Sequence, residues 1–366
     1  MAKMALNNIF YRFAHKTMRM FSSSVLKFQV TIPNFKLNNG KEMPALGFGT
    51  WLGLDEKLEF KVSDAPKLVD AMLYAIDIGY RHFDTAHFYR MEPEVGYVIK
   101  KKIEEGVVRR EDVFVTTKVW QHNHRTDDAY ASIEASLRRL GLDYIDLVLI
   151  HWPISMDING VDEKIDYLET YRGLENAMKN GLVKSIGVSN FNLAQLERLL
   201  SNCEVKPAVN QIQVTINLLE KELVSFCKAQ NILVVSYSSF GSLTRSYATD
   251  APPPKPDDPC LVQMGRKYNK TATQLVLRFL YQRGIATIPK SLTKARILEN
   301  ASIFDFEIDS GDVATLEKFD CGYRSDVPIF WQEYTNYPFE KQKKEFFIDM
   351  PESLLKWKNG ANLDID

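Results

Sequence analysis

A carboxylate, an ammonium and an imidazole close three successive apolar segments of this sequence, and a phenol follows the first of them. These residues are Asp84, Lys118, His151 and, five positions after the aspartate, Tyr89. Taken singly, such residues are most often solvated charges or structural histidines. Four ionisable groups of complementary type at equivalent positions suit one kind of chemistry, in which they deliver a proton to a carbonyl oxygen while another agent delivers a hydride.

Each of the four groups has an expected part in that chemistry. A phenol is a weak acid, with an ordinary pKa of about 10. We expect the Lys118 ammonium to favour the phenolate and lower the pKa of Tyr89. Asp84 is the expected counterion for a buried Lys118, and His151 is expected to orient the carbonyl oxygen. No metal is needed, and the four cysteines of the sequence show no paired metal-ligand spacing.

The segments that carry these residues belong to a longer alternation of strands and helices. Apolar runs predict eight strands, at Gly47–Trp51, Arg81–Asp84, Val113–Lys118, Ile145–His151, Val183–Ser189, Ala208–Val214, Ile232–Tyr237 and Ala286–Pro289. Patterns of helical period predict helices at Ala65–Ile78, Glu94–Glu105, Thr126–Leu140, Tyr167–Asn180, Leu193–Ser201, Glu220–Gln230, Cys260–Gln282 and Thr293–Ala301. Strict alternation, with strands apolar on both faces, predicts an α/β fold of the (β/α)8 barrel type.

Further segments flank the predicted barrel. Asn38-Asn39-Gly40 between two β-prone runs predicts a hairpin, which we expect to plug the bottom of the barrel. A last helix is expected at Val313–Phe319. The aromatic stretch after Tyr323 is expected to form a substrate loop, so residues 28–347 make one domain and 348–366 a tail.

Motifs in a fixed order along the chain resemble those of the aldo-keto reductase family, in particular its aldose reductase-like NADPH-dependent carbonyl reductases. The matching segments are Gly79–Gly96, Val115–Trp120, Leu149–Pro153, Gly187–Phe191, Asn210-Gln211, and Ile288–Ser291 with Arg296, Glu299 and Asn300. The resemblance covers about Phe28 to Phe347, and spaced motifs in order are more specific than any single one.

The resemblance implies NADP(H) as the cofactor. The residues it assigns to the cofactor are Ser189, Asn190, Gln211, Tyr237, Ser238, Lys290, Ser291, Arg296, Glu299 and Asn300. Tyr237 offers a ring to stack on the nicotinamide. Cations and a hydroxyl around a helix start suit a phosphate monoester, which favours NADP(H) over NAD(H). The glycine-rich fingerprint of a Rossmann fold is missing from the sequence.

The identity of the substrate is left open by the sequence. Expected substrate contacts are Trp51, Trp120, His151, Trp152 and the tail. An aldose-like aldehyde, a ketosteroid or ecdysteroid, and a quinone all fit. Three departures from the family pattern lie near the site: Met91 in place of Asn, Gln213-Val214-Thr215, and Ser239-Phe240-Gly241. A redox-sensing or regulatory subunit of the same fold is the alternative function, but a binding module need not keep all four catalytic groups.

The composition is that of an ordinary globular protein, with 366 residues and a net charge of −1. It gives no reason to expect a nucleic-acid or membrane partner, and we expect a monomer that binds a small carbonyl compound. Residues 1–27 are basic and lack acidic residues, and Ser22-Ser23-Ser24 lies within them. This extension is typical of mitochondrial transit peptides, whereas the family resemblance favours the cytosol, so both addresses remain open.

Overall fold

A computed structural model describes residues 29–55, 59–243 and 251–341. The basic N-terminal extension and the tail 348–366 lie outside these residues. Eight parallel strands form one sheet in chain order: β3 Phe48–Gly49, β4 His82–Asp84, β5 Phe114–Val119, β6 Leu147–Ile150, β7 Ile186–Ser189, β8 Val209–Gln213, β9 Leu233–Tyr237 and β10 Ala286–Thr287. The two edges of the sheet meet, because Gly47 N donates to Thr287 O (2.8 Å) and Thr287 N donates to Ala45 O (3.0 Å). The predicted (β/α)8 barrel is confirmed.

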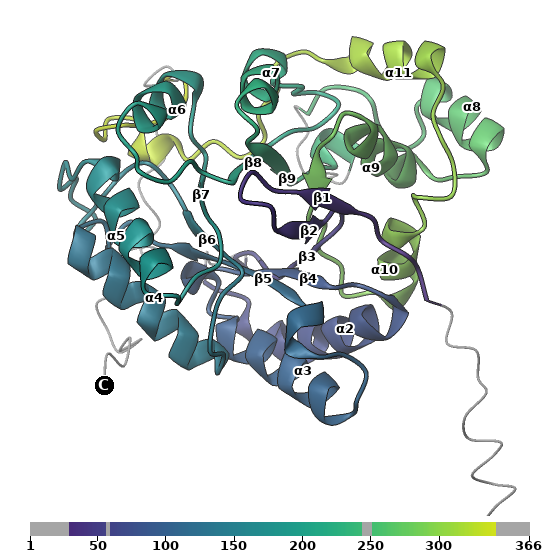
Figure 1. The fold of residues 1–366 in the computed structure, drawn as a ribbon. Helices are drawn as coiled ribbons and strands as arrows, with labels where there is room; N and C mark the ends of the chain where they lie inside the picture. Colours follow the sequence, from purple (N-terminus) through teal and green to yellow (C-terminus); the bar gives the residue numbers. More distant parts are fainter. Residues whose placement is uncertain (1–28, 56–58, 244–250, 342–366) are drawn as a thin grey trace, which may run out of the picture.

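Helices surround the barrel on its outside (Figure 1). Eight follow the strands: α2 Ala65–Ile78, α3 Glu92–Glu104, α4 Thr126–Leu140, α5 Tyr167–Lys179, α6 Leu193–Leu200, α7 Lys221–Ala229, α9 Ala272–Gln282 and α10 Lys294–Ala301. Two more are α8 Pro259–Tyr268 and α11 Ser310–Leu316. No helix in the described part of the chain is long and apolar enough to cross a membrane.

One expected helix is in fact two. The periodic pattern from Cys260 to Gln282 predicted a single helix, but the structure ends α8 at Tyr268 and begins α9 at Ala272. Asn269 adopts the left-handed conformation (φ 54°), which terminates α8. Thr271 then caps α9 by accepting from Gln274 N. These two caps therefore divide the segment into two helices, although its apolar residues follow one continuous helical period.

The expected hairpin closes the bottom of the barrel. Strands β1 (Asn34–Lys36) and β2 (Glu42–Pro44) pair antiparallel, and Figure 1 shows them in dark purple across the near end of the strands. Leu37 and Met43 pack with inward side chains of the strands, including Phe114. The plug fills the amino-terminal end of the barrel, which leaves the carboxyl ends of the strands for a site.

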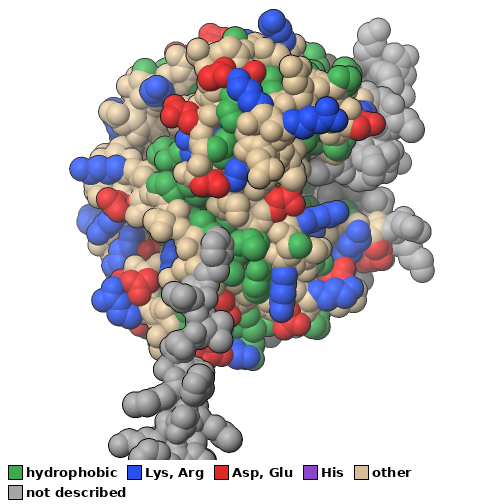
Figure 2. All heavy atoms as spheres, turned by 90° about the vertical axis from the view of Figure 1, so that its right-hand side faces the viewer, with side chains coloured by type: hydrophobic (Ala, Val, Ile, Leu, Met, Phe, Trp, Pro, Cys, Tyr) green, Lys and Arg blue, Asp and Glu red, His purple; other side chains and the backbone are tan. Residues whose placement is uncertain are grey.

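The outer surface carries charges of both signs. Figure 2 shows the face on the right-hand side of Figure 1, where lysine and arginine side chains lie among aspartates and glutamates. Among the described ion pairs, Lys267 of α8 pairs with Asp312 of α11 (2.7 Å) and Lys270 pairs with Asp305 (2.7 Å). Such exposed pairs contribute little to stability individually.

Candidate active site

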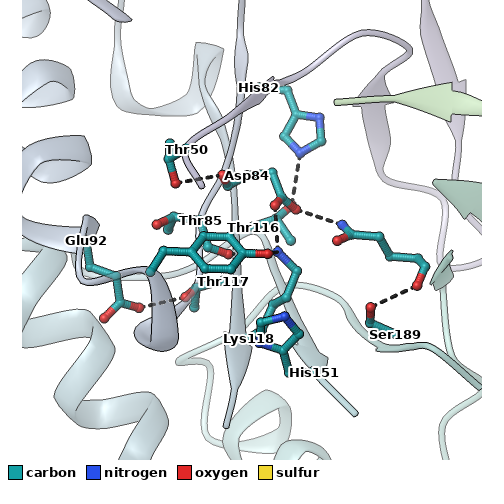
Figure 3. Close-up of polar contacts among 12 residues, drawn as sticks. Thr50, His82, Asp84, Thr85, Glu92, Thr116, Thr117, Lys118, His151 and Ser189 are labelled. Carbon is teal, nitrogen blue, oxygen red and sulfur yellow. Dashed lines mark hydrogen bonds and ion pairs between the residues drawn. The ribbon is translucent and has the colours of Figure 1, made fainter. Parts of the chain in front are cut away.

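The four ionisable residues meet at the carboxyl end of the barrel. Asp84 is the last residue of β4, Lys118 lies near the end of β5, and His151 directly follows β6. Tyr89 ends a short 3-10 turn, η2 (His87–Tyr89), between β4 and α3. The parallel register pairs Asp84 with Thr116 and Lys118 with Leu149, which brings the strand ends together at one edge. The arrangement predicted from strand ends is therefore observed (Figure 3).

Lys118 and Asp84 form a buried ion pair. Lys118 Nζ lies 2.6 Å from Asp84 Oδ1, and their side chains are 0% and 2% exposed. Asp84 Oδ2 accepts from Gln211 Nε2 (2.7 Å), and Lys118 Nζ also donates to Thr85 O (3.0 Å). Burial lowers the pKa of Lys118, and Asp84 opposes that shift. The carboxylate is thus the group that keeps a desolvated ammonium charged.

Tyr89 lies beside this pair, but its acidity differs from our expectation. Lys118 Nζ is 3.4 Å from the Tyr89 hydroxyl oxygen and 4.8 Å from the ring centroid. We expected the ammonium to lower the pKa of the phenol. Burial instead raises the pKa of Tyr89 well above 10, and the charge of Asp84 adds to the increase. Desolvation and the carboxylate outweigh the ammonium at this distance, so the phenol is fully protonated near neutral pH.

His151 faces Tyr89 as a neutral imidazole. The two rings are 5.5 Å apart between centroids and nearly perpendicular. Burial and the Lys118 charge place the pKa of His151 well below 6.5. Its Nδ1 is buried without a hydrogen-bond partner among the described residues. A neutral imidazole has one N–H to donate, which suits hydrogen bonding to a carbonyl oxygen.

The residues assigned to the nicotinamide form a connected polar group next to the ion pair. Ser189 Oγ donates to Gln211 O (2.8 Å), and Tyr237 donates its hydroxyl to Asn190 Oδ1 (2.7 Å). Asn190 Nδ2 in turn donates to His151 O (3.0 Å). Gln211 is shared with the proton-transfer group through Asp84. The residues expected to hold the hydride donor and those expected to transfer the proton therefore belong to one hydrogen-bonded network.

The segment expected to bind the coenzyme phosphate carries two cations. Lys290 and Arg296 form no salt bridge with any described residue. Between them, α10 begins at Lys294, and Thr293 provides no side-chain cap. Ser291 Oγ accepts from Thr293 N (3.1 Å), which turns the chain into the helix. Unpaired cations beside an uncapped helix start fit a phosphate monoester.

The other three residues assigned to the cofactor differ in their contacts and exposure. Glu299 accepts from the hydroxyls of Thr271 (2.6 Å) and Thr273 (2.8 Å) and so ties α10 to α9. Asn300 is buried, and its amide makes no hydrogen bond to a described residue. Asn300 therefore has free hydrogen-bonding capacity, whereas one Glu299 oxygen is already used in the fold. Ser238 is exposed at the end of β9 and has a positive φ (47°).

Aromatic rings surround the mouth of the site. Trp51 stacks on Phe88 (5.5 Å), and Phe88 stacks on Trp120 at 3.9 Å with an interplanar angle of 14°. Trp120 is only 1% exposed, so it supports the wall from behind Phe88. Phe88 was not singled out from the sequence, although its place beside Tyr89 was the available signal. Trp152, the remaining expected contact, is half-buried.

The C-terminal segment completes this wall. Trp331 ends the turn η6 (Ile329–Trp331) and packs edge-on against Trp120 (5.9 Å) and Trp152 (5.6 Å). Figure 1 shows the segment in yellow running past α7 to α6, where Gln195 Nε2 donates to Asn336 O (2.8 Å). The C-terminal segment thus packs against two of the tryptophans expected to contact substrate.

Comparisons with known proteins agree with this geometry. The sequence model of the "Aldo/keto reductase family" matches residues 45–320. Aldo-keto reductase AKR2E4 of Bombyx mori is 42% identical over 84% of this chain and 99% of its own length. Aldo-keto reductase family 1 member C18 of Rattus norvegicus is 38% identical over 85% and 98%.

Solved structures are similar as well. The chain superposes on aldo-keto reductase AKR2E5 complexed with NADPH with a TM-score of 0.86 and 58% identity, covering 91% of this chain and 100% of that one. Bombyx mori AKR2E4 in complex with NADP gives a TM-score of 0.81 and 41% identity, with 85% and 100% covered.

Proposed function

Since this chain belongs to the aldo/keto reductase family and is an NADP(H)-dependent oxidoreductase, we propose that it reduces a carbonyl compound to an alcohol with Tyr89 as the proton donor. The observation that supports this role is the contact between Tyr89 and a buried charged pair. Lys118 Nζ lies 2.6 Å from Asp84 Oδ1 and 3.4 Å from the Tyr89 hydroxyl. A bound nicotinamide would supply the hydride.

The chain's own residues handle the proton. Because burial raises the pKa of Tyr89, the phenol holds its proton until a strongly basic oxygen forms beside it. The alkoxide that develops on the carbonyl oxygen is such a base, and it takes the proton as the new C–H bond forms. Lys118 then stabilises the phenolate left behind, and Asp84 keeps Lys118 charged. His151 donates its single N–H to the same oxygen and orients the carbonyl group.

The coenzyme phosphate would be held by Lys290, Ser291, Arg296 and Asn300. The nicotinamide would be held by Asn190, Gln211 and Tyr237. Lys290 and Arg296 support this assignment because they form no salt bridge in the described structure. Ser189 holds two of these residues in place, because its hydroxyl donates to Gln211 O (2.8 Å) and accepts from Asn190 Nδ2 (3.2 Å).

The substrate we propose is an apolar carbonyl compound with a flat or ring-shaped body. Trp51 and Trp152 are half-buried at the mouth, and the wall behind them consists of Phe88, Trp120 and Trp331. Such a wall favours ring stacking, and it offers the hydroxyls of a polyhydroxylated chain little beyond the indole N–H groups of its tryptophans. An aromatic aldehyde or ketone should therefore have a higher kcat/KM than a sugar aldehyde, and the reverse order would contradict this substrate class.

Tyr89→Phe tests the proposed proton donor. The change removes one hydroxyl and almost no volume, so the fold and NADPH affinity should be kept. Turnover of an aromatic aldehyde should fall by about 10²–10⁴, the usual effect of losing a general acid. NADPH oxidation gives the rate, and coenzyme fluorescence gives the affinity. Near-normal turnover with NADPH still bound would move the proton donor elsewhere, first to His151. No turnover in the unmodified protein would instead favour a redox-sensing subunit.

A further inference from the structure

A buried carboxylate outside the four-residue site joins the two segments that carry Tyr89 and Lys118. Glu92 is the first residue of α3, three residues after Tyr89, and it is 1% exposed. Its Oε1 accepts from Thr117 Oγ1 at 2.6 Å, as Figure 3 shows. Its Oε2 accepts from Arg139 Nε of α4, also at 2.6 Å. One acidic side chain thus connects α3 to both β5 and α4.

The partner on β5 is the immediate neighbour of Lys118. Side chains alternate along a strand: Phe114 faces the barrel interior, while Val115 and Val119 pack in the core beneath the helices. Lys118 therefore points into the barrel, and Thr117 points outward to the helix layer. Glu92 therefore binds β5 from the helix side, at Thr117, the residue next to Lys118.

A second link holds the other side of the Tyr89 turn to the same strand. Thr85, four residues before Tyr89, donates its N–H to Thr116 O (2.8 Å), and its carbonyl oxygen accepts from Lys118 Nζ (3.0 Å). Glu92 provides the matching link after the turn, at Thr117. The turn between them is followed by Arg90 in the left-handed conformation (φ 59°). The segment that carries Tyr89 is thus hydrogen-bonded to β5 on both sides, at the consecutive residues Thr116 and Thr117.

We propose that Glu92 is a positioning residue that, through Thr117, fixes the Tyr89 hydroxyl at its distance from Lys118 Nζ. The proposal rests on the proton-donor role of Tyr89 given above. Without the Glu92 link, the downstream side of the turn keeps the packing of α3 and the contact of Arg90 with the Phe60 ring (4.2 Å), but it loses its bond to Thr117. The phenol then gains freedom relative to the ammonium and the carbonyl oxygen. A displacement of about 1 Å in a reacting group lowers rates by up to about 100-fold.

Two other roles for Glu92 give different expectations. If it only packs α3 against α4 through Arg139, its loss should lower stability and leave kcat unchanged. If its charge acts on Lys118, any neutral replacement should be equally harmful, since the Glu92 carboxylate favours the charged ammonium. A geometric role depends instead on the bond to Thr117 and survives in a neutral side chain that keeps this bond.

The experiment compares three variants under saturating NADPH. Thr117→Val keeps the shape of the side chain and removes the hydroxyl, and Glu92→Met removes both bonds. Each should lower kcat by about 10-fold to 100-fold, with KM for the carbonyl and NADPH affinity nearly unchanged. Glu92→Gln should recover most of the loss seen in Glu92→Met, because its amide can donate to Thr117 Oγ1 while its oxygen accepts from Arg139. Glu92→Gln falling as far as Glu92→Met would overturn the geometric role.

A matched control is available at the opposite end of β5. Asp146 accepts from Arg110 Nη2 (2.7 Å) and from Val115 N (3.0 Å), so it also joins an arginine to this strand. Asp146→Asn should lower the melting temperature and leave kcat as it is. Thr117→Val with normal kcat, or a kcat loss in Asp146→Asn equal to that in Thr117→Val, would overturn the proposal.

Combining Thr117→Val with Tyr89→Phe tests this proposal separately from the proposed function. If Glu92 acts through Tyr89, Thr117→Val should have little further effect on the residual rate of Tyr89→Phe. A full additional loss would mean that the link serves some other group, which would overturn the positioning role. An active Tyr89→Phe would refute the proton-donor role itself, whereas an inactive Tyr89→Phe beside a fully active Thr117→Val would refute only the positioning role.

Discussion

Lys118→Met should destabilise the protein as well as stop its chemistry. The replacement is apolar and of similar length, so the packing volume is roughly kept. What is lost is the partner of a carboxylate that is itself 2% exposed. At 2.6 Å and an effective dielectric constant of about 20, the attraction is about 6 kcal/mol before desolvation is counted. Removing one member of such a buried pair typically costs about 3–5 kcal/mol.

The double variant Asp84→Asn with Lys118→Met distinguishes an uncompensated charge from lost packing. An asparagine at position 84 would leave no buried charge and could still bind Gln211 through its amide oxygen. We therefore expect the double variant to be more stable than Lys118→Met alone, within about 1–2 kcal/mol of the wild type. It should nevertheless fail to reduce a carbonyl compound, because the phenolate would have no ammonium beside it.

Urea denaturation without coenzyme is the appropriate assay, since bound coenzyme would add its own stabilisation. Asp146→Asn, at a pair whose members are each 17% exposed, is a reference for a less buried charge. If Lys118→Met cost less than about 1 kcal/mol, or if the double variant were less stable than either single one, our account of the ion pair would be wrong. An active double variant would remove Lys118 from the mechanism.

Other parts of the chain give three more expected outcomes. Lys290→Ala with Arg296→Ala should weaken NADPH binding by a few kcal/mol, at about 1.5–3 per charged hydrogen bond, and leave NADH binding nearly unchanged in a fluorescence titration; equal losses would refute the phosphate site. Burial lowers the pKa of His82 and His124 to about 3 and that of His151 well below 6.5. Burial also lowers the pKa of His122 to about 4 and that of His87 well below 6.5. Because the unfolded chain takes up these five protons near pH 6.5 and the folded chain does not, the free energy of unfolding should fall by up to about 7 kcal/mol per pH unit below that value, at about 1.4 for each histidine; urea midpoints that stay constant from pH 7 to pH 5.5 would contradict this. Finally, residues 1–26 fused to a fluorescent protein should direct it to mitochondria if they form a transit peptide, and diffuse fluorescence would favour the cytosol.

Much of the site could be predicted because it depends on order along the chain. Asp84, Lys118 and His151 each end an apolar strand, and parallel strands in a barrel must bring their carboxyl ends to one rim. The hairpin at Gly40 is predicted by the residues of its turn, and each strand or helix is predicted by the period of its own apolar residues. The cations Lys290 and Arg296 flank a helix start in the sequence itself, so their suitability for a phosphate is visible before folding.

Other features are decided only when distant segments meet. Gln211 bonds Asp84 across 127 positions, and Glu92 reaches Thr117 and Arg139 from two different elements. The neighbouring lysine suggested a lowered pKa for Tyr89. Burial of the phenol raises that pKa instead, and the extent of burial is set by the tertiary structure. Strand ends and helix starts follow from local residue types and their period, whereas burial and hydrogen-bond partners are properties of the closed barrel, because they depend on which groups exclude water from one another.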